Sequence, residues 1–444
     1  MTLNDFLNKL EDKNPGQSEY LQAVRDVYED VFPWLDGHKE YLEEKLPERL
    51  SEPDRILEFR ITWRDGKGNI RINTGWRVQH NNALGAYKGG LRFKEGLKLD
   101  TLKFLAFEQT FKDALTGLPM GGAKGGSDFN PKEFEKEDIE RFCQAYMIEL
   151  YRHIGQDTDV PAGDIGVGAR EIGYLFGTYK KIENKFQGAL TGKSPAFGGS
   201  CIREEATGYG TVYFLKHYLE NSGGALEDKK VLISGSGNVA LFAAEKLLNL
   251  DVNIKSVSDS DGTLEFKEGM TFDLLEALKV LKFEKRGRLN EIETGKFKDQ
   301  VNYHKGKQPW GLEGANVAIP AATQNEIGEN EAKALLKSGV DTICEASNMP
   351  LTTDATKYVR GLKSMTILPS KAVNAGGVAV SGLERSQNAE YQHWSAEKVD
   401  GELQSIMSDI FKTCLKYGEG DFVKGANIAG FERVANAVIA YGAN

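Results

Sequence analysis

The stretch Lys230-Val231-Leu232-Ile233-Ser234-Gly235-Ser236-Gly237-Asn238-Val239-Ala240 decides the fold of the second half of the chain. A short apolar strand runs into the pattern GxGxxA, a helix is expected from Leu241 to Leu248, and a second strand, 252–257, ends at Ser258-Asp259-Ser260. The first glycine suits a tight turn, the second admits a pyrophosphate, and the small third residue lets helix and strand pack closely. The sequence therefore predicts a Rossmann-like dinucleotide site with the pyrophosphate on a helix N-terminus.

Three later segments repeat the pattern of a short apolar strand followed by a polar loop. The expected strands are 317–319, 342–345 and 365–368, and each runs directly into its loop. Ligands of an open α/β sheet bind beyond the carboxyl ends of the strands, so we expect these loops to line the cofactor cleft.

Length and composition limit the class of protein. A chain of 444 residues is long enough for two or three domains. Its net charge of −9 argues against nucleic acid or an anionic membrane as the main partner, and no apolar run approaches the roughly 18 residues that cross a bilayer. The four cysteines are scattered, without a CxxC pair or a histidine spacing that suits zinc, so we expect reduced thiols and no metal site. The N-terminus lacks the features of a signal peptide, and we expect a cytoplasmic protein.

The first half contains a glycine-rich stretch around one lysine, Thr116-Gly117-Leu118-Pro119-Met120-Gly121-Gly122-Ala123-Lys124-Gly125-Gly126. Glycines at this density let another molecule approach the backbone closely. Loss of water from Lys124 in a closed site would lower its pKa and suit it to acid–base or carbonyl chemistry near neutral pH. The alternative interpretation is a flexible surface turn with a solvated lysine.

Two neighbouring segments hold further polar candidates. In the helix expected from Asp100 to about Leu115, Gln109 and Lys112 project from one face beside an apolar stripe. The alternative for Lys112 is a side chain that reaches water near a helix C-terminus. Pro and Gly fix a turn around Asp164, whose carboxylate can face a cleft, although an ordinary Asp-Gly turn explains the same residues.

Four motifs of the whole chain carry a family resemblance. They are Tyr87-Lys88-Gly89-Gly90-Leu91-Arg92-Phe93, Leu118 to Gly126, Pro161-Ala162-Gly163-Asp164-Ile165-Gly166, and Asn374-Ala375-Gly376-Gly377-Val378-Ala379-Val380-Ser381-Gly382-Leu383-Glu384. Together they resemble the glutamate dehydrogenases, in the short homohexameric form, within the Glu/Leu/Phe/Val dehydrogenase superfamily. The resemblance covers essentially the whole chain, with one departure at Ala123, where the family commonly has glycine.

The resemblance implies reversible oxidative deamination of L-glutamate to 2-oxoglutarate and ammonium with a nicotinamide cofactor, and a role in amino-acid metabolism and nitrogen assimilation. It also implies roles for the substrate residues. Lys124 would polarise the carbonyl or activate water, and Asp164 would shuttle the proton. The residues that would bind substrate are Lys88 and Ser381 at the distal carboxylate, Gln109 and Lys112 at the α-carboxylate, and also Gly163 and Val378.

The cofactor residues come from the same resemblance together with the Rossmann pattern. Thr207 and Asn374 would meet the nicotinamide end, and Asn348 would lie near its ribose. The pyrophosphate would be held by the GxGxxA turn. The remaining cofactor-binding candidates complete the set: Gly235, Ser236, Gly237, Asn238, Val239, Ser258, Asp259, Ser260, Lys282, Arg288 and Ala322.

The choice between NADP and NAD depends on the end of the second Rossmann strand. An acidic residue there usually accepts the ribose 2′-OH, so Asp259 by the general rule favours NAD. However, Ser258-Asp259-Ser260 looks like the segment of NADP-using members of the family, whereas NAD-using members often have Gly-Pro-Asp-Gly. The basic residues 282–288 could fold over a 2′-phosphate, or could form a solvated helix end. We predict NADP, with NAD as the alternative.

The fold of the family supplies the expected domain plan, which is α/β with two domains. Residues 1–199 with 420–444 would form an α/β substrate-binding and oligomerisation domain, to which the C-terminal helices return. Residues 200–419 would form the Rossmann-like domain. A cleft between the domains would close to exclude water. The homohexamer is expected from the resemblance alone.

Two rival functions remain open at this point. An enzyme of the same superfamily could act on an apolar amino acid, but Lys88 and Ser381 would then be costly to desolvate opposite an aliphatic side chain. A non-catalytic, cofactor-binding regulatory protein could share the scaffold, but Lys124 and Asp164 are both in place, which argues against it.

Overall fold

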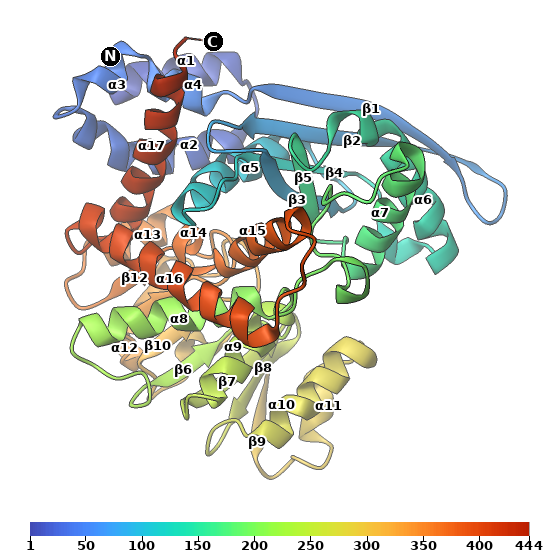
Figure 1. The fold of residues 1–444 in the computed structure, drawn as a ribbon. Coiled ribbons are helices and arrows are strands. Elements are labelled where there is room, and N and C mark those ends of the chain that lie inside the picture. Colours follow the sequence, from blue (N-terminus) through green and yellow to red (C-terminus); the bar gives the residue numbers. More distant parts are fainter. Residues whose placement is uncertain (444) are drawn as a thin grey trace. The chain divides into compact units, whose positions relative to one another are not determined.

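The computed structural model describes residues 1–443, which pack into two compact units (Figure 1). The first unit contains Met1–Arg203, Val378–Asp400 and the chain from Asn427 onward, and the second contains Glu204–Gly377 and Gly401–Ala426. Three long helices near the C-terminus carry the chain from one unit to the other: α15 (Gly376–Ala389), α16 (Ala396–Gly418) and α17 (Phe422–Tyr441).

The first unit is built on a five-stranded mixed sheet in the order β1-β2-β4-β3-β5. The β1–β2 hairpin is antiparallel and continues antiparallel to β4, whereas β3 is parallel to both β4 and β5. In Figure 1 this hairpin extends as a long ribbon. The strands are β1 (Arg55–Arg64), β2 (Ile70–Asn81), β3 (Tyr87–Phe93), β4 (Gly122–Ser127) and β5 (Asp159–Gly163).

Helices and an aromatic core surround this sheet. Helix α5 packs on β4 and β2 and also against α2. On α6, Phe142 stacks on Phe129 with ring centroids 3.8 Å apart, and Phe93 of β3 meets Phe142 edge to face. Such aromatic pairs add stability beyond the area that they bury. The helices are α1 (Leu3–Lys13), α2 (Ser18–Leu35), α3 (Lys39–Glu43), α4 (Leu46–Ser51), α5 (Leu99–Leu115), α6 (Lys136–Leu150) and α7 (Ala169–Glu183).

The part of the glycine-rich stretch that holds Lys124, Gly122–Ser127, is a buried strand and not a flexible surface turn, whereas Gly117 and Pro119 before it are exposed. Glycine is required there by close packing of backbones. A Cβ at Gly89 of β3 would lie 1.6 Å from the carbonyl oxygen of Ala123, and a Cβ at Gly122 would lie 2.0 Å from Thr110 Oγ1 of α5. The missing side chains bring β3, β4 and α5 together and fix the catalytic candidate in a sheet.

The second unit is a seven-stranded sheet in the order β12-β11-β10-β6-β7-β8-β9. Five strands are parallel and two, β8 and β9, are antiparallel at one edge. The strands are β6 (Lys230–Ile233), β7 (Asn253–Asp259), β8 (Gly262–Phe266), β9 (Val301–Lys305), β10 (Val317–Ile319), β11 (Thr342–Cys344) and β12 (Thr366–Leu368). The helices include α8 (Ala206–Asn221), α9 (Asn238–Leu248), α10 (Phe272–Lys279), α11 (Asn290–Glu293), α12 (Glu329–Ser338), α13 (Thr353–Arg360) and α14 (Ser370–Val373).

This is the predicted α/β organisation, and its Rossmann-type sheet begins at the predicted strand 230–233. Three segments are grouped differently: 200–203 and 378–400 belong to the first unit, and 420–426 belongs to the second. The predicted second domain, 200–419, included 378–400, whereas packing groups that segment with the first unit, because α15 is bonded to the loop 188–203. No helix among residues 1–443 is both long and apolar enough to cross a membrane.

Candidate active site

Lys124 and Asp164 form a pair in the first unit. Lys124, on β4, is 5% exposed, and its Nζ lies 3.2 Å from Asp164 Oδ1. The other carboxylate oxygen, Oδ2, accepts a 2.6 Å hydrogen bond from Arg92 Nε of β3. Glycine at position 90 makes room for this arrangement, because a Cβ there would lie 2.9 Å from Asp164 Cβ. The turn expected around Asp164 therefore follows β5 and directs its carboxylate at Lys124.

The charges of this pair are set by burial and by their partners. Burial lowers the pKa of Lys124, while Asp164 opposes that shift and Arg92 adds to it. Burial alone would raise the pKa of Asp164, but Lys124 and Arg92 outweigh burial and lower it to about 2. The carboxylate is therefore ionised at neutral pH beside an amine that gives up its proton more readily than a solvated lysine.

A second group of polar side chains comes from β3 and α5. Lys88 of β3 is 1% exposed, and burial lowers its pKa, with Asp113 opposing the shift. Asp113 is fully buried, and burial raises its pKa to about 8 against the influence of Lys88. Gln109 Nε2 donates to Asp113 Oδ1 at 2.6 Å, while Oδ2 has no hydrogen-bond partner among the described residues.

Lys112 links the two groups. Burial lowers its pKa to about 8, and the next contribution is repulsion by Lys124. This coupling means that Lys112 and Lys124 lie within reach of each other's field. The candidates on β3, α5 and β4 thus lie in one electrostatically coupled region of the first unit, with its lysines shifted toward neutral amines.

Ser381 is held by an arginine that the motif reasoning missed. Arg203 Nε donates to Ser381 Oγ at 2.9 Å, and Ser381 is 1% exposed. Arg203 also contributes to the lowered pKa of Lys88, which places its charge near that amine. Gly163 ends β5, and Val378 lies in the first turn of α15, three residues before Ser381.

Four functional candidates were missed by the sequence reasoning: Arg92, Asp113, Arg203, and Arg385, whose charge also lowers the pKa of Lys88. Two left a signal. Lys88, Gly90 and Arg92 alternate along β3 and therefore share a face. Asp113 follows Gln109 by four residues and is flanked by the apolar Phe111 and Ala114, and a buried carboxylate there needs a partner.

The predicted dinucleotide turn lies between β6 and α9 of the second unit. Gly235 has φ +81°, and a Cβ there would lie 2.9 Å from the carbonyl oxygen of Ala321. At Gly237, which precedes the first residue of α9, no heavy atom of residues 1–443 other than those of Gly237 and its two chain neighbours lies within 4 Å of the position that a Cβ would take. Open space at a helix N-terminus fits a pyrophosphate. Asn238 and Val239 form the first turn of α9.

Two asparagines, Asn374 and Asn348, are the candidates for the nicotinamide end of the cofactor. Asn374 Nδ2 donates to Asn348 Oδ1 at 3.0 Å. The carbonyl oxygen of Asn374, Oδ1, is buried and has no partner among the residues described. An unpaired buried acceptor suits a ligand amide such as the carboxamide of nicotinamide. Thr207 lies in the first turn of α8, and the Ala322 amide donates to Glu326.

At the end of β7, the Asp259 carboxylate is bonded to other groups of the protein. Its Oδ1 accepts from the Asp261 amide and its Oδ2 from the Leu289 amide, both at 3.0 Å, and Lys282 Nζ lies 3.7 Å from Oδ2. Arg288 Nη1 donates to Ser260 Oγ at 2.8 Å. The basic segment is thus folded onto this turn, rather than forming only a solvated helix end.

Ser258 differs from its two neighbours. It is 2% exposed, and its hydroxyl accepts a 2.9 Å hydrogen bond from the Gly235 amide. This hydroxyl stabilises the GxGxxA turn through its hydrogen bond to Gly235. Because Ser258 is buried, it is less available to a phosphate than Ser260.

A lysine–carboxylate pair in one unit, followed in the chain by a Rossmann-type unit, is the arrangement that we expect of an amino-acid dehydrogenase. The family model described as Glutamate/Leucine/Phenylalanine/Valine dehydrogenase matches residues 198–442, and the one described as Glu/Leu/Phe/Val dehydrogenase, dimerisation domain, matches residues 53–181. The chain belongs to this family.

Relatives and solved structures agree over the full length. The chain is 52% identical to the NAD(P)-specific glutamate dehydrogenase of Xylanibacter ruminicola, covering 100% of both chains, and 48% identical to the NADP-specific glutamate dehydrogenase of Haemophilus influenzae, covering 99% and 98%. The structure of Plasmodium falciparum glutamate dehydrogenase superposes with a TM-score of 0.96 at 47% identity, over 99% of this chain and 94% of that one. The predicted family, fold class and nicotinamide-dependent dehydrogenase activity are confirmed.

Proposed function

We propose that this protein catalyses the reversible oxidative deamination of L-glutamate to 2-oxoglutarate and ammonium, with NADP as the preferred hydride acceptor. The observation that carries the proposal is the ion pair of the buried Lys124 with Asp164, coupled to Lys112, in the same unit as the buried Lys88. A dicarboxylate needs two cationic anchors. In an enzyme for leucine or valine, the buried Lys88 would face an aliphatic side chain and would have no carboxylate to bind. The names of the full-length relatives support the same substrate.

In the proposed mechanism the substrate is held at both ends. Lys88 and Ser381 bind its distal carboxylate, and Gln109 and Lys112 bind its α-carboxylate. This places Cα beside Lys124. NADP, when bound, supplies the site that accepts the hydride from Cα, and the turn at Gly235 and Gly237 with Asn374 would hold it.

The proton chemistry belongs to Lys124 and Asp164. A buried lysine with a lowered pKa can release and recover a proton near neutral pH, so Lys124 can activate water or polarise the carbonyl oxygen of 2-oxoglutarate. Asp164 is ionised in the resting site and its Oδ1 lies 3.2 Å from Lys124 Nζ, where it can accept a proton from the amine transiently and pass it on.

The experiment is an assay of the purified protein with 2-oxoglutarate, ammonium and reduced cofactor, followed by the absorbance of that cofactor. We expect turnover with 2-oxoglutarate and little with the 2-oxo acids of leucine and valine. A preference for either branched 2-oxo acid would contradict the proposed substrate, and no turnover with any of them would favour a regulatory role.

The preference for NADP is supported by the segment folded onto the end of β7. Asp259 already accepts from two backbone amides and faces Lys282, so its charge is engaged within the protein. Arg288 and Ser260 are bonded to each other at the surface, where both can contact a 2′-phosphate. Asp259 is nevertheless at the position that accepts a ribose hydroxyl, which leaves NAD as the alternative.

The cofactor preference is tested by the ratio of kcat/KM for NADPH to that for NADH. We expect the wild type to favour NADPH and Arg288→Ala with Ser260→Ala to lower the ratio about tenfold or more, since a charge-assisted contact is worth about 1.5–3 kcal/mol. A wild-type ratio that favours NADH and does not respond to the two substitutions would identify Asp259 as the ribose ligand.

We also propose that the first unit and the C-terminal helices form the substrate and assembly domain of a cytoplasmic homohexamer, and that the second unit binds the cofactor. Exposed apolar side chains support an assembly role for the β1–β2 hairpin: Ile56, Ile70 and Ile72 are 40%, 62% and 68% exposed. These residues lie in the region matched by the dimerisation-domain model. The cysteines Cys143, Cys201, Cys344 and Cys414 are free, as expected in a reducing compartment.

A further inference from the structure

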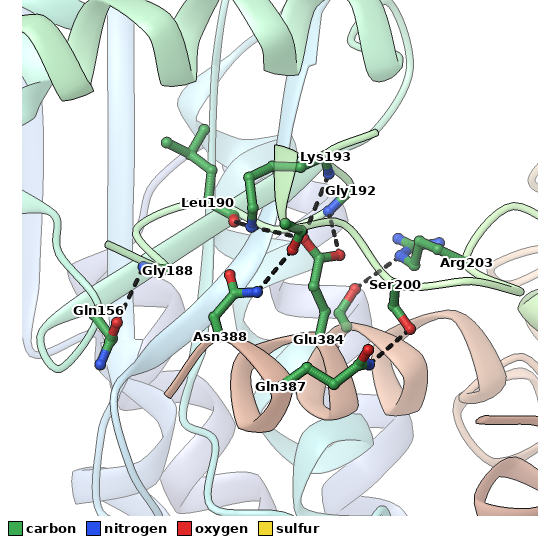
Figure 2. A network of polar contacts seen from close by, with 12 residues as sticks. Gln156, Gly188, Leu190, Gly192, Lys193, Ser200, Arg203, Glu384, Gln387 and Asn388 are labelled. Atoms are coloured by element: carbon green, nitrogen blue, oxygen red, sulfur yellow. Dashed lines mark hydrogen bonds and ion pairs between the residues drawn. The ribbon is translucent and has the colours of Figure 1, made fainter. Parts of the chain in front are cut away.

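The segment 188–203 of the first unit is held on α15 by buried polar contacts (Figure 2). At their centre Lys193 Nζ lies 2.6 Å from Glu384 Oε1, and both side chains are 0% exposed. The amides of Gly192 and Lys193 donate to the same carboxylate, at 2.9 and 3.4 Å, and Lys193 Nζ also donates to the carbonyl of Leu190. Glu384 therefore accepts three hydrogen bonds from one short loop.

The segment 188–203 also contacts Ser381 of α15, which is a proposed substrate ligand. Glu384 lies three residues after Ser381, so the two are about one turn apart on one face of the helix. Gln387 Nε2, a turn further on, donates to Ser200 Oγ at 2.8 Å, and at the end of the segment Arg203 Nε donates to Ser381 Oγ at 2.9 Å. The segment is thus bonded to α15 at three successive turns, and Lys193–Glu384 is the ionic contact among them.

The segment is also bonded to the chain that leads to Asp164. The Thr191 amide donates to the carbonyl of Pro161 in β5 at 3.0 Å, and the Gly188 amide donates to Gln156 Oε1 at 3.0 Å. Because β5 ends directly before Asp164, a displacement of this loop would act on both sides of the proposed substrate site.

Stability alone gives little reason for a buried ion pair here. Burying each ion costs several kcal/mol, and apolar residues of similar volume are often as stable or more so. Contacts between apolar side chains, however, have no preferred direction and would not fix the position of the loop along the helix. A carboxylate with three donors from one loop allows a single register of that loop on the helix.

We propose that Lys193 and Glu384 are positioning residues for the substrate's distal carboxylate. They set the register of 188–203 on α15 and thereby place Arg203 and the Ser381 hydroxyl. Neither residue is assigned a contact with the reacting atoms. The inference rests on the proposed function, in which Ser381 and Lys88 bind that carboxylate.

The test replaces both charges by apolar side chains of similar volume, Lys193→Met with Glu384→Met. We expect a melting temperature within a few degrees of the wild type, a KM for 2-oxoglutarate raised about tenfold, and an unchanged KM for ammonium. The ratio of kcat/KM for 2-oxoglutarate to that for 2-oxopentanoate, which lacks the distal carboxylate, should fall by about tenfold. A merely structural role would lower all activities together and leave this ratio unchanged.

Two further variants keep the test decisive. Glu384→Gln retains the size of the side chain and an acceptor for the loop amides, and should lower the same ratio if the double variant fails to fold. Asp30→Leu with Asn427→Leu removes another buried polar contact of the first unit, of 2.7 Å, and should change the melting temperature without changing the ratio. A folded Glu384 variant with wild-type KM and ratio would overturn the inference. A wild type inactive on 2-oxoglutarate and ammonium would instead overturn the proposed function.

Discussion

Lys124 combines burial, a fixed backbone and a carboxylate partner, which together define its proposed chemistry. We expect Lys124→Ala to fold and to bind cofactor but to lose about 10²-fold or more in kcat, because acid–base and electrostatic contributions are each of that size. Lys67→Ala, in the exposed turn of the β1–β2 hairpin, is the control and should keep wild-type turnover. Steady-state kinetics at saturating substrates measure the effect. If Lys124→Ala kept a tenth of wild-type kcat, another residue would carry the chemistry.

The lowered pKa of Lys112 predicts a pH dependence of substrate binding. Its pKa is lowered to about 8, so the side chain loses its positive charge as the pH rises through that value. Above pH 8 the proposed α-carboxylate anchor therefore becomes neutral, and KM for 2-oxoglutarate should rise while kcat changes less. Arginine stays charged throughout this range, so Lys112→Arg should move the rise in KM to higher pH. A rise at the same pH in that variant would assign the titration to another group, such as Lys124.

At the scale of elements, the glycine positions of β3 and β4 are requirements of packing. We expect Gly89→Ala to lower the free energy of unfolding by about 3 kcal/mol or more, because the carbonyl of Ala123 would have to move. The control is Gly177→Ala on α7, where a new Cβ would meet no heavy atom of the described residues within 4 Å apart from the adjacent residues and the local helix backbone. That change should be neutral or stabilising by up to about 1 kcal/mol. Thermal unfolding compares the two variants, and equal melting temperatures would contradict the packing account.

Elements with a clear local sequence pattern could be predicted from the sequence. The GxGxxA turn follows from spacing alone, since strand, glycines and helix each have a local signal. Strand β4 could not be predicted, because glycine has a low propensity for strands and the six residues Gly122–Ser127 include three glycines and a serine. Only the contact with Thr110 and with β3 makes those glycines favourable.

The arginines of the site could not be predicted for a different reason. Arg203 lies in a loop without periodicity, and its role depends on Ser381, which is 178 positions away in the sequence. The periodicity of α15 likewise indicates a helix but not its neighbours. That is why 378–400 was assigned to the second domain, although Glu384 and Gln387 bind a loop of the first unit.

At the scale of the whole molecule, the exposed isoleucines of the β1–β2 hairpin predict an assembly surface. We expect Ile70→Arg with Ile72→Arg to reduce the mass measured by light scattering coupled to size-exclusion chromatography, because two charges would be buried in an apolar contact. Phe272→Arg, an exposed apolar side chain of the second unit, is the matched control and should leave the mass unchanged. A double variant with wild-type mass would place the interface elsewhere.

The position of Lys124, the proposed catalytic lysine, on a strand limits the insertions and deletions that the gene can tolerate. Strand β4 is paired on both edges, with β2 and β3, so its register is fixed from two sides. Side chains alternate between the faces of a sheet, and one codon added or deleted between Gly122 and Lys124 would turn that amine to the opposite face. In a library that carries single-codon insertions at every position, growth that depends on this enzyme should therefore fail throughout 122–127.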